Sequence, residues 1–408
     1  MKICIIGTAI PPVTGGLETY THELARHLIL SGHEVCLIGY QTFPNTPLYE
    51  KKDDIHIYRV PNVFLLKNKA YFIFAYNLIK KLHKKFNFDI IHAQTAAPAG
   101  FTGALLKCKY KLPLVITSHG FELIVRGEQW WVQPFIKFAF KHADKIIGVS
   151  EEMSELSIQN GADKLKTVTM ANAVDTALFT PNPLNPSLQK GEIGGFNIRQ
   201  KLGIPSDKIV ILALRRLVPK TGVQYLIKIA PDIIKMYPDV YFLIVGTGQL
   251  ENELTETVNK LGMEKNIIFT GTVPNHDVPD YIRAADFSVF PSFAEATSIA
   301  CLEVMSCEKP VVVSNVGGLP EIVKHEKTGL IVDFKKTNST YNDYGLPDEV
   351  IDSLKCSIIR LIKDENLRKK LGENARNFVI NNYSWDIYLR KILKIYTEIG
   401  NRHACSLQ

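Results

Sequence analysis

The hydrophobic residues of the first 180 positions form short apolar runs that alternate with longer segments of helical periodicity. Between the first two runs, Leu17, Leu24, Ala25 and Leu28 recur at helical spacing and predict a helix over 17–33. Continuous apolar strands that alternate with helices are typical of a parallel sheet covered on both faces. The predicted strands are 2–7, 34–39, 54–60, 89–94, 113–120 and 145–150.

A second alternation of the same kind occupies residues 200–383. Residues 181–195 between the two are rich in proline, glycine and asparagine and predict a linker. The expected fold class is therefore α/β, with two Rossmann-like doubly wound domains at 1–180 and 200–383 joined by a linker at 181–199. The second set of predicted strands is 208–214, 240–246, 266–271, 287–292, 310–314 and 330–334.

The composition is that of a globular protein with an affinity for anions. Of 408 residues, 46% are hydrophobic and 22% charged, and the net charge of +7 favours partners that carry phosphate. The seven cysteines contain no C-x-x-C pair, which argues against a zinc site or a disulfide framework. The apolar N-terminal run is short and broken by Gly7, and no run reaches about 20 residues, so we expect a cytoplasmic protein.

The stretch 291–321 combines two glutamates, a short helix, a buried strand and a glycine pair. Glu295 and Glu303 are eight residues apart, which in a helix corresponds to about 12 Å. A carboxylate pair that hydrolyses a glycosidic bond lies about 5 to 9.5 Å apart. We therefore expect the two glutamates to hold opposite ends of one elongated ligand.

Other polar residues lie where predicted strands end, which is where open α/β sheets bind ligands. Gly15 and Gly16 open the first helix and could offer backbone amides to an anion, although a tight connection without a ligand has the same pattern. His119 ends the strand 113–120, where it could donate to a sugar hydroxyl or serve only the structure. The strand 208–214 is followed by Arg215, Arg216 and Lys220, which indicate a phosphate site, although a solvated basic loop is the alternative.

The pattern E-x7-E, followed by KPVVV and GGLPEIV, resembles the retaining nucleotide-sugar glycosyltransferases of glycosyltransferase family 4. That resemblance implies the GT-B fold, in which two Rossmann-like domains face each other across a cleft, and a C-terminal helix, here 384–400, that crosses back to the first domain. It implies catalytic roles for His119, Arg216, Lys220 and Glu295, and substrate binding by Gly15, Gly16, Gly246, Val273, Thr297, Ser298, Ile299 and Glu303.

The chain departs from the family pattern G-R-L-x-x-x-K-G at two positions. Arg215 stands where glycine is usual, and Thr221 stands where lysine is usual, with Lys220 one residue earlier. No D-x-D triplet is present, so we expect no metal or other cofactor, and a diphosphate stabilised by Arg216, Lys220 and helix-start amides. The expected partners are a nucleotide-sugar donor, with UDP first and GDP next, and a glycan or lipid-linked acceptor, but no nucleic acid.

Three other functions remain open from the sequence. A nucleotide-sugar epimerase has the same architecture, and a non-catalytic nucleotide-sugar-binding subunit would keep the same motifs. A dehydrogenase fits least, because no G-x-G-x-x-G directly follows a strand.

Two basic aromatic segments, 70–86 and 129–141, could attach the protein to an anionic membrane surface. The alternative is that their apolar faces pack on the sheet while the lysines stay in solvent. The sequence leaves both open.

Overall fold

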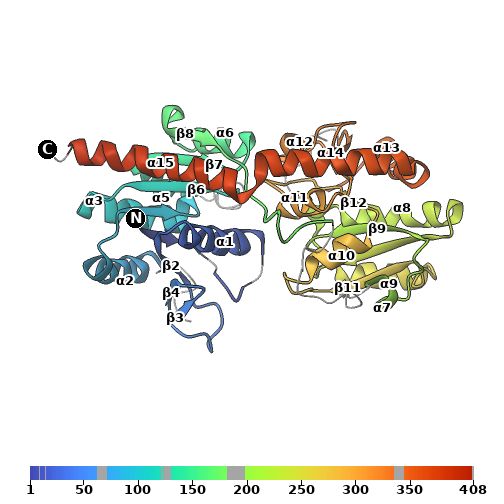
Figure 1. Cartoon of the computed structure of the whole chain (residues 1–408), viewed down its shortest axis with the longest axis horizontal. Helices are drawn as coiled ribbons and strands as arrows, with labels where there is room; N and C mark the ends of the chain where they lie inside the picture. Colours follow the sequence, from blue (N-terminus) through green and yellow to red (C-terminus); the bar gives the residue numbers. More distant parts are fainter. Residues whose placement is uncertain are drawn as a thin grey trace. The chain divides into compact units, whose positions relative to one another are not determined.

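The computed structural model describes residues 1–8, 10–13, 15–61, 71–120, 123, 130–181, 198–334 and 344–406. These residues form two compact units (Figure 1). Unit 1 contains Met1–Asn172 and Trp385–Gln408, and unit 2 contains Ala173–Ser384. Most of the expected linker, at 182–197, lies outside the described residues.

Unit 1 ends at Asn172 and not at residue 180, because the segment that follows packs on unit 2. The Phe179 side chain is 3% exposed and lies in the core of unit 2. Its carbonyl accepts hydrogen bonds from Ser306 Oγ at 2.6 Å and from Arg376 Nη1 at 3.2 Å.

Unit 1 has an eight-stranded sheet in the order β3-β4-β2-β1-β5-β6-β7-β8. All neighbouring strands are parallel except β3 and β4, which form an antiparallel pair at the edge. Chain order reverses at β1, which pairs with β2 on one side and with β5 on the other. The strands are β1 Lys2–Ile6, β2 Glu34–Tyr40, β3 Tyr49–Lys52, β4 Ile55–Val60, β5 Ile90–Ala93, β6 Leu114–Ser118, β7 Lys145–Gly148 and β8 Thr167–Thr169.

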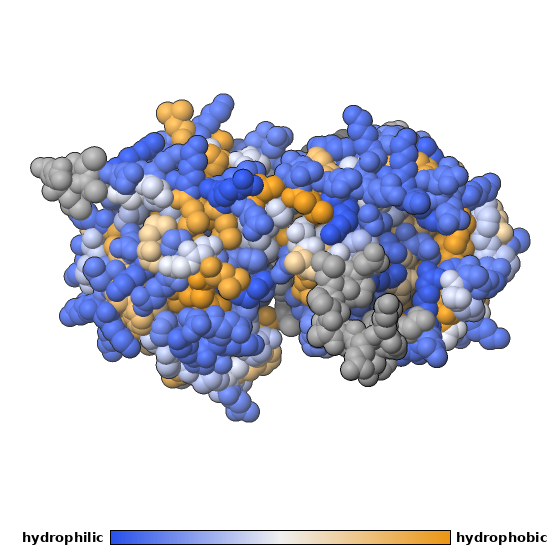
Figure 2. Space-filling view, viewed as in Figure 1, coloured by the Kyte–Doolittle hydropathy of each residue, from blue (hydrophilic) through white to orange (hydrophobic). Residues whose placement is uncertain are grey.

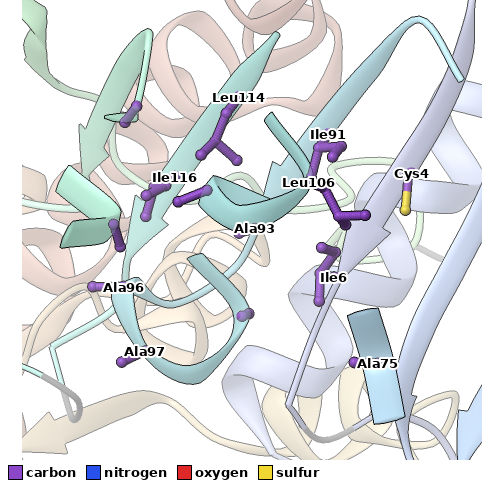
Figure 3. Packing of buried hydrophobic residues seen from close by; sticks show 14 of the residues in the cluster. Cys4, Ile6, Ala75, Ile91, Ala93, Ala96, Ala97, Leu106, Leu114 and Ile116 are labelled. Atoms are coloured by element: carbon purple, nitrogen blue, oxygen red, sulfur yellow. The ribbon is translucent and has the colours of Figure 1, made fainter. Parts of the chain in front are cut away.

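Helices cover both faces of this sheet. Alternate strand residues, such as Ile6, Ile91 and Leu114, pack with α2, α3 and α5 in one buried cluster (Figure 3). α1 and α15 contact each other, and Tyr20 of α1 bonds Tyr388 of α15. The helices are α1 Gly16–Leu30, α2 Tyr71–Phe86, η2 Ala96–Gly100, α3 Phe101–Tyr110, α5 Gln133–His142, α6 Glu151–Gln159, η3 Lys164–Lys166 and α15 Trp385–Ser406.

Unit 2 has a six-stranded parallel sheet in the order β11-β10-β9-β12-β13-β14. Most residues of the inner strands are buried, as expected for strands covered on both faces, whereas those of the edge strand β11 are mostly only partly buried. Chain order reverses between β9 and β12, which are direct neighbours. The strands are β9 Ile209–Leu214, β10 Val240–Val245, β11 Ile267–Gly271, β12 Phe287–Phe290, β13 Val311–Ser314 and β14 Gly329–Val332.

Two separate clusters of buried residues flank the sheet of unit 2. One joins the sheet to α8, α9 and α13, and the other joins it to α10, α11 and α14. The helices are α7 Ile198–Lys201, η4 Pro219–Thr221, α8 Val223–Met236, α9 Glu251–Lys260, α10 Val278–Ala284, α11 Ile299–Ser306, α12 Leu319–Ile322, α13 Asp348–Lys363 and α14 Glu365–Tyr383. Among the helices of the described ranges, none combines the length and the apolar character that crossing a bilayer requires.

Candidate active site

The carboxyl ends of β9 and β12 bring the predicted basic and acidic residues of unit 2 together. Arg215 directly follows β9, and the segment 291–298 follows β12 and leads into α11 (Figure 1). Because chain order reverses between these two strands, their connections lead to helices on opposite faces of the sheet. This is the position at which open α/β sheets bind ligands.

Arg215, which the sequence places with Arg216 and Lys220 at an anion site and at a position where glycine is usual, is the central basic residue of this edge. Its side chain is 5% exposed. Nη2 donates to Ser292 Oγ at 2.6 Å and lies 3.4 Å from Glu295 Oε2. The guanidinium carbon is 5.4 Å from the centre of the Phe290 ring. Burial lowers the pKa of Arg215 to about 10, which leaves it cationic at physiological pH.

The two predicted cations lie beside Arg215 but differ from it in exposure. Arg216 is exposed, and Lys220 is half-buried in η4. Burial lowers the pKa of Lys220, the Glu295 charge opposes that shift, and the charges of both arginines add to it. Thr221, at the usual lysine position, donates to the carbonyls of Val218 and Arg216 at 2.7 and 3.0 Å. It therefore stabilises the turn.

The backbone of Glu295 is held by the glycine pair. The amide of Gly318 donates to the Glu295 carbonyl at 3.1 Å. Gly317 has φ of +53°, and a Cβ at that residue would lie 1.6 Å from the same carbonyl oxygen. Only glycine fits such a close approach. The Glu295 side chain is 24% exposed, so it is open to a ligand.

The start of α11 provides backbone and side-chain groups for an anion or a sugar. Thr297 and Ser298 are buried, and Ile299 is the first residue of the helix. Ser298 Oγ accepts from the amide of Cys301 at 3.3 Å and caps the helix. The free amides of a first helical turn, together with the helix dipole, favour a negative charge at this end.

Glu303 lies one turn further along α11 and is 8% exposed. Burial raises the pKa of its carboxyl to about 7. A buried carboxylate costs free energy unless it is paired or hydrogen-bonded. The cost is recovered when hydroxyl donors of a ligand reach it.

The remaining predicted residues of unit 2 lie at the carboxyl ends of β10 and β11. Gly246 has φ of +130°, and a Cβ there would lie 2.1 Å from the Arg215 carbonyl, so this close passage requires glycine. Its amide donates to the Gly271 carbonyl at 2.9 Å. Val273 is partly buried in the turn after β11. Both residues therefore line the same edge of the sheet as Arg215.

In unit 1, the predicted residues lie at the carboxyl ends of β1 and β6. Gly15 caps α1, and Gly16 is its first residue. His119 directly follows β6, and its Nε2 lies 3.1 Å from Gln94 Oε1. The His119 ring meets Tyr20 edge to face at 5.0 Å. Burial lowers the pKa of His119 to about 3, so the ring is neutral and acts as a hydrogen-bonding group.

Sequence reasoning missed two polar residues on β5 and directly after it. His92, on β5, is fully buried between Tyr396 of α15 and Thr117, at 2.6 and 2.7 Å. Gln94, just after β5, is fully buried, and its Nε2 has no partner among the described residues. The position of Gln94 at a strand end next to β1 is the signal that could have identified it.

The basic aromatic surface of unit 1 combines exposed apolar residues with lysines. Most apolar residues of α2 and α5 pack on the sheet, which confirms that part of the alternative interpretation. The Phe72 and Phe135 rings lie 6.2 Å apart, centre to centre, so the two helices are neighbours.

The first residues of the predicted segments, Ala70 and Gln129, lie outside the described residues. On the face of unit 1 seen in Figure 2, apolar patches lie between hydrophilic side chains. The exposed members of the surface are Ile73, Phe74, Trp130, Trp131, Lys81, Lys84, Lys85, Lys137 and Lys141.

Taken together, unit 2 offers cations and amides for an anion, a carboxylate at partly exposed Glu295, and a second carboxylate at buried Glu303. The two carboxylates stand on either side of the start of α11, which suits an elongated ligand with a negative centre and hydroxyl groups at each end.

Family models match both halves of the chain. The model for glycosyl transferases group 1 matches residues 196–378, and the model for glycosyltransferase family 4 matches residues 14–178. A similar protein of Escherichia coli, 26% identical over 98% of this chain and 97% of its own, is a UDP-Gal:alpha-D-GlcNAc-diphosphoundecaprenol alpha-1,3-galactosyltransferase. Another, from Mycolicibacterium smegmatis, is 24% identical over 93% and 94% of the two chains and is a GDP-mannose-dependent alpha-(1-6)-phosphatidylinositol monomannoside mannosyltransferase.

Solved structures of other proteins share the fold of this chain. The sucrose-phosphate synthase of Thermosynechococcus elongatus superposes with a TM-score of 0.79 over 98% of both chains, at 20% sequence identity. At that identity the likeness shows the fold, and function has to be argued from the site itself.

Proposed function

The chain belongs to the group 1 glycosyltransferases of glycosyltransferase family 4 and has the GT-B fold, and from this we propose that it transfers a hexose-type sugar from a nucleoside diphosphate sugar with retention of configuration. The observation that carries the proposal is the meeting of Arg215, Arg216 and Lys220 with Glu295 at the carboxyl edge of the unit 2 sheet.

The diphosphate of the donor would be bound without a metal. Arg216 is exposed and can bind a phosphate through two parallel N–H groups, and Lys220 adds a point charge beside it. The amides at the start of α11 supply further donors. Such fixed cations and dipoles stabilise the charge that develops on a departing diphosphate.

The two glutamates would bind the ends of the donor. Glu303 would accept hydrogen bonds from the two ribose hydroxyls, since a carboxylate can accept two at once. Glu295 would lie beside the sugar, with Gly246 and Val273 near the nucleotide. UDP is the first candidate, following the Escherichia coli relative, and GDP is the second, following the Mycolicibacterium relative.

Unit 1 would bind the acceptor. The Gly15–Gly16 turn offers backbone amides, and neutral His119 offers a ring nitrogen to a sugar hydroxyl. Both relatives act on lipid-linked acceptors, so a lipid-linked or other cell-envelope glycan is the acceptor we infer. The enzyme would then work in the cytoplasm, in part at the membrane surface.

A panel of nucleotide sugars tests the donor. At a ligand concentration of 100 times Kd, the free energy of unfolding rises by about 2.7 kcal/mol. We therefore expect one UDP-sugar or GDP-sugar to raise the melting temperature by several degrees, with the same shift in EDTA. Nucleotide release measured with a lipid-linked acceptor identifies a transferase. Conversion of the donor without any acceptor would indicate an epimerase, and binding without turnover would indicate a non-catalytic subunit. No shift with any donor contradicts the proposal.

The basic aromatic surface predicts binding to anionic lipid. We expect the protein to sediment with vesicles that contain phosphatidylglycerol at low salt and to be released from them at high salt. Each lysine near such a surface contributes about 1 kcal/mol to the binding free energy, and salt screens this attraction. Replacing Trp130 and Trp131 by serine together with Lys84 and Lys85 by glutamate is expected to weaken binding at least about tenfold.

The matched control for vesicle binding lies elsewhere on unit 1. Leu165 is 89% exposed and Lys164 is exposed beside it, away from α2 and α5 in the sequence. Leu165→Ser with Lys164→Glu removes the same kinds of group and is expected to leave sedimentation unchanged. Equal binding by all three proteins would show that the basic aromatic surface does not contact lipid.

A further inference from the structure

Arg215 lies in direct contact with Glu295 at the edge of the unit 2 sheet. It follows β9, and Ser292 follows the neighbouring strand β12. Because parallel neighbours end at the same edge of a sheet, the two side chains meet there. Arg215 Nη2 donates to Ser292 Oγ at 2.6 Å, and Ser292 Oγ lies 3.4 Å from Glu295 Oε2. The same Nη2 is 3.4 Å from that carboxylate oxygen.

The three contacting residues, Arg215, Ser292 and Glu295, differ in how far they are buried. Ser292 is fully buried, the Arg215 side chain is 5% exposed, and the Glu295 side chain is 24% exposed. Glu295 is thus the member that a ligand can reach, and Arg215 lies behind it. Phe290 lies against the guanidinium and limits its movement.

Burying the Arg215 guanidinium costs free energy, which argues that its charge has a functional role. Its Nε and Nη1 are buried and have no hydrogen-bond partner among the described residues. A buried donor without a partner costs about 1–3 kcal/mol. Glu295 is the acidic group that offsets the burial of the cation. Because the guanidinium is buried and contacts Glu295, it is suited to fix the position of that carboxylate.

Arg216 provides the contrast. It is adjacent in sequence and exposed, so it can turn to a phosphate. The two arginines therefore lie on different sides of the connection after β9, one facing the protein and one facing solvent.

We propose that Arg215 is a positioning residue for Glu295, which it holds in place through Ser292 and by direct charge contact. The proposal rests on the proposed function, because it assigns Arg215 to the sugar end of the donor site and leaves the diphosphate to Arg216 and Lys220. Arg215 then influences turnover with little influence on nucleotide affinity.

The test compares Arg215→Gln with Arg216→Gln, which removes the same charge one residue away. For Arg215→Gln we expect UDP affinity within about threefold of wild type and a loss in kcat of about 30- to 100-fold, since misplacing a catalytic group by 1 Å costs about 10². For Arg216→Gln we expect UDP affinity to fall at least tenfold. Equal losses of UDP affinity in both variants would make Arg215 a diphosphate ligand and overturn the proposal.

A double-mutant cycle tests the coupling between the two residues. Glu295→Gln and Arg215→Gln combined are expected to reduce kcat no further than Glu295→Gln alone, because residues that act through one another are not additive. Additive losses would show that Arg215 acts independently. Ser292→Ala, a smaller change, is expected to give a partial loss of the same kind, and Arg215→Lys serves if the glutamine variant does not fold.

Hydrogen exchange separates this proposal from the proposed function. In Arg215→Gln we expect amides of 291–298 to exchange at least about tenfold faster than in wild type, while β9 and β12 stay protected. This measurement does not depend on catalytic activity. If wild type transfers no sugar but the exchange changes as expected, the proposed function fails and the positioning role stands. Unchanged exchange in 291–298 together with an unchanged kcat overturns the positioning role.

Discussion

Glu295→Gln is expected to lower the rate of sugar transfer by about 10²- to 10³-fold while leaving UDP affinity within a few-fold of wild type. The amide keeps the shape of the side chain and the hydrogen bond from Ser292 but removes the negative charge. If Glu295 stabilises positive charge that develops on the sugar as the diphosphate leaves, the loss falls on kcat, because interactions made only in the transition state do not contribute to ground-state binding.

The measurement is kcat and KM for donor turnover, with the Kd of UDP determined separately. Glu373→Gln is the matched control, since Glu373 is exposed on α14 of the same unit. A Glu295→Gln variant with an unchanged kcat and a raised KM would assign Glu295 to donor binding alone.

The pattern of apolar runs was sufficient to predict most of the fold. Strands such as Ile209–Leu214 and Val311–Ser314 are buried on both faces, so their sequences are continuously apolar and easily recognised. β3, Tyr49–Lys52, was not predicted, because an edge strand that is mostly exposed carries the sequence YEKK without a hydrophobic signal. β8 is three residues long and equally weak in pattern.

The boundary of unit 1 could not be located from composition alone. The proline-rich stretch after residue 180 marks where the chain lacks periodicity, and not where its contacts change. Contacts change earlier, at Asn172, because Phe179 is buried among residues far away in sequence. Such a contact leaves no trace in the local pattern.

Site residues were predictable where a close backbone approach dictates the residue type. Gly317 and Glu295 come from one motif, and the structure joins them by the contact that only glycine allows. The roles of Arg215 and Arg216 could not be separated in this way. Two adjacent arginines in a turn carry the same charge, and only the tertiary structure decides which one is buried. His92 was missed for a related reason, because its partners Tyr396 and Thr117 lie on distant segments.

Glu303→Gln is expected to stabilise the ligand-free protein above neutral pH and to weaken nucleotide binding. Burial raises the pKa of Glu303 from its ordinary 4.5 to about 7. The folded state therefore favours the protonated carboxyl, and the stability that this contributes is complete below pH 4.5 and lost as pH rises through 7. At pH 8 the variant, which stays neutral, is expected to gain up to about 3 kcal/mol relative to wild type. The gain should disappear near pH 4.5.

Binding separates the functional role of Glu303 from its effect on stability. Because the ionised carboxylate would accept from both ribose hydroxyls, Glu303→Gln is expected to lower UDP affinity about 10- to 100-fold at pH 8. Wild type should prefer UDP to 2′-deoxy-UDP, and the variant should discriminate much less, whereas Glu373→Gln should match wild type in both affinity and stability. Thermal unfolding from pH 4.5 to 8 and calorimetric titration with the two nucleotides provide the data. A stability gain without loss of ribose discrimination would leave Glu303 as a buried carboxyl that contacts no nucleotide.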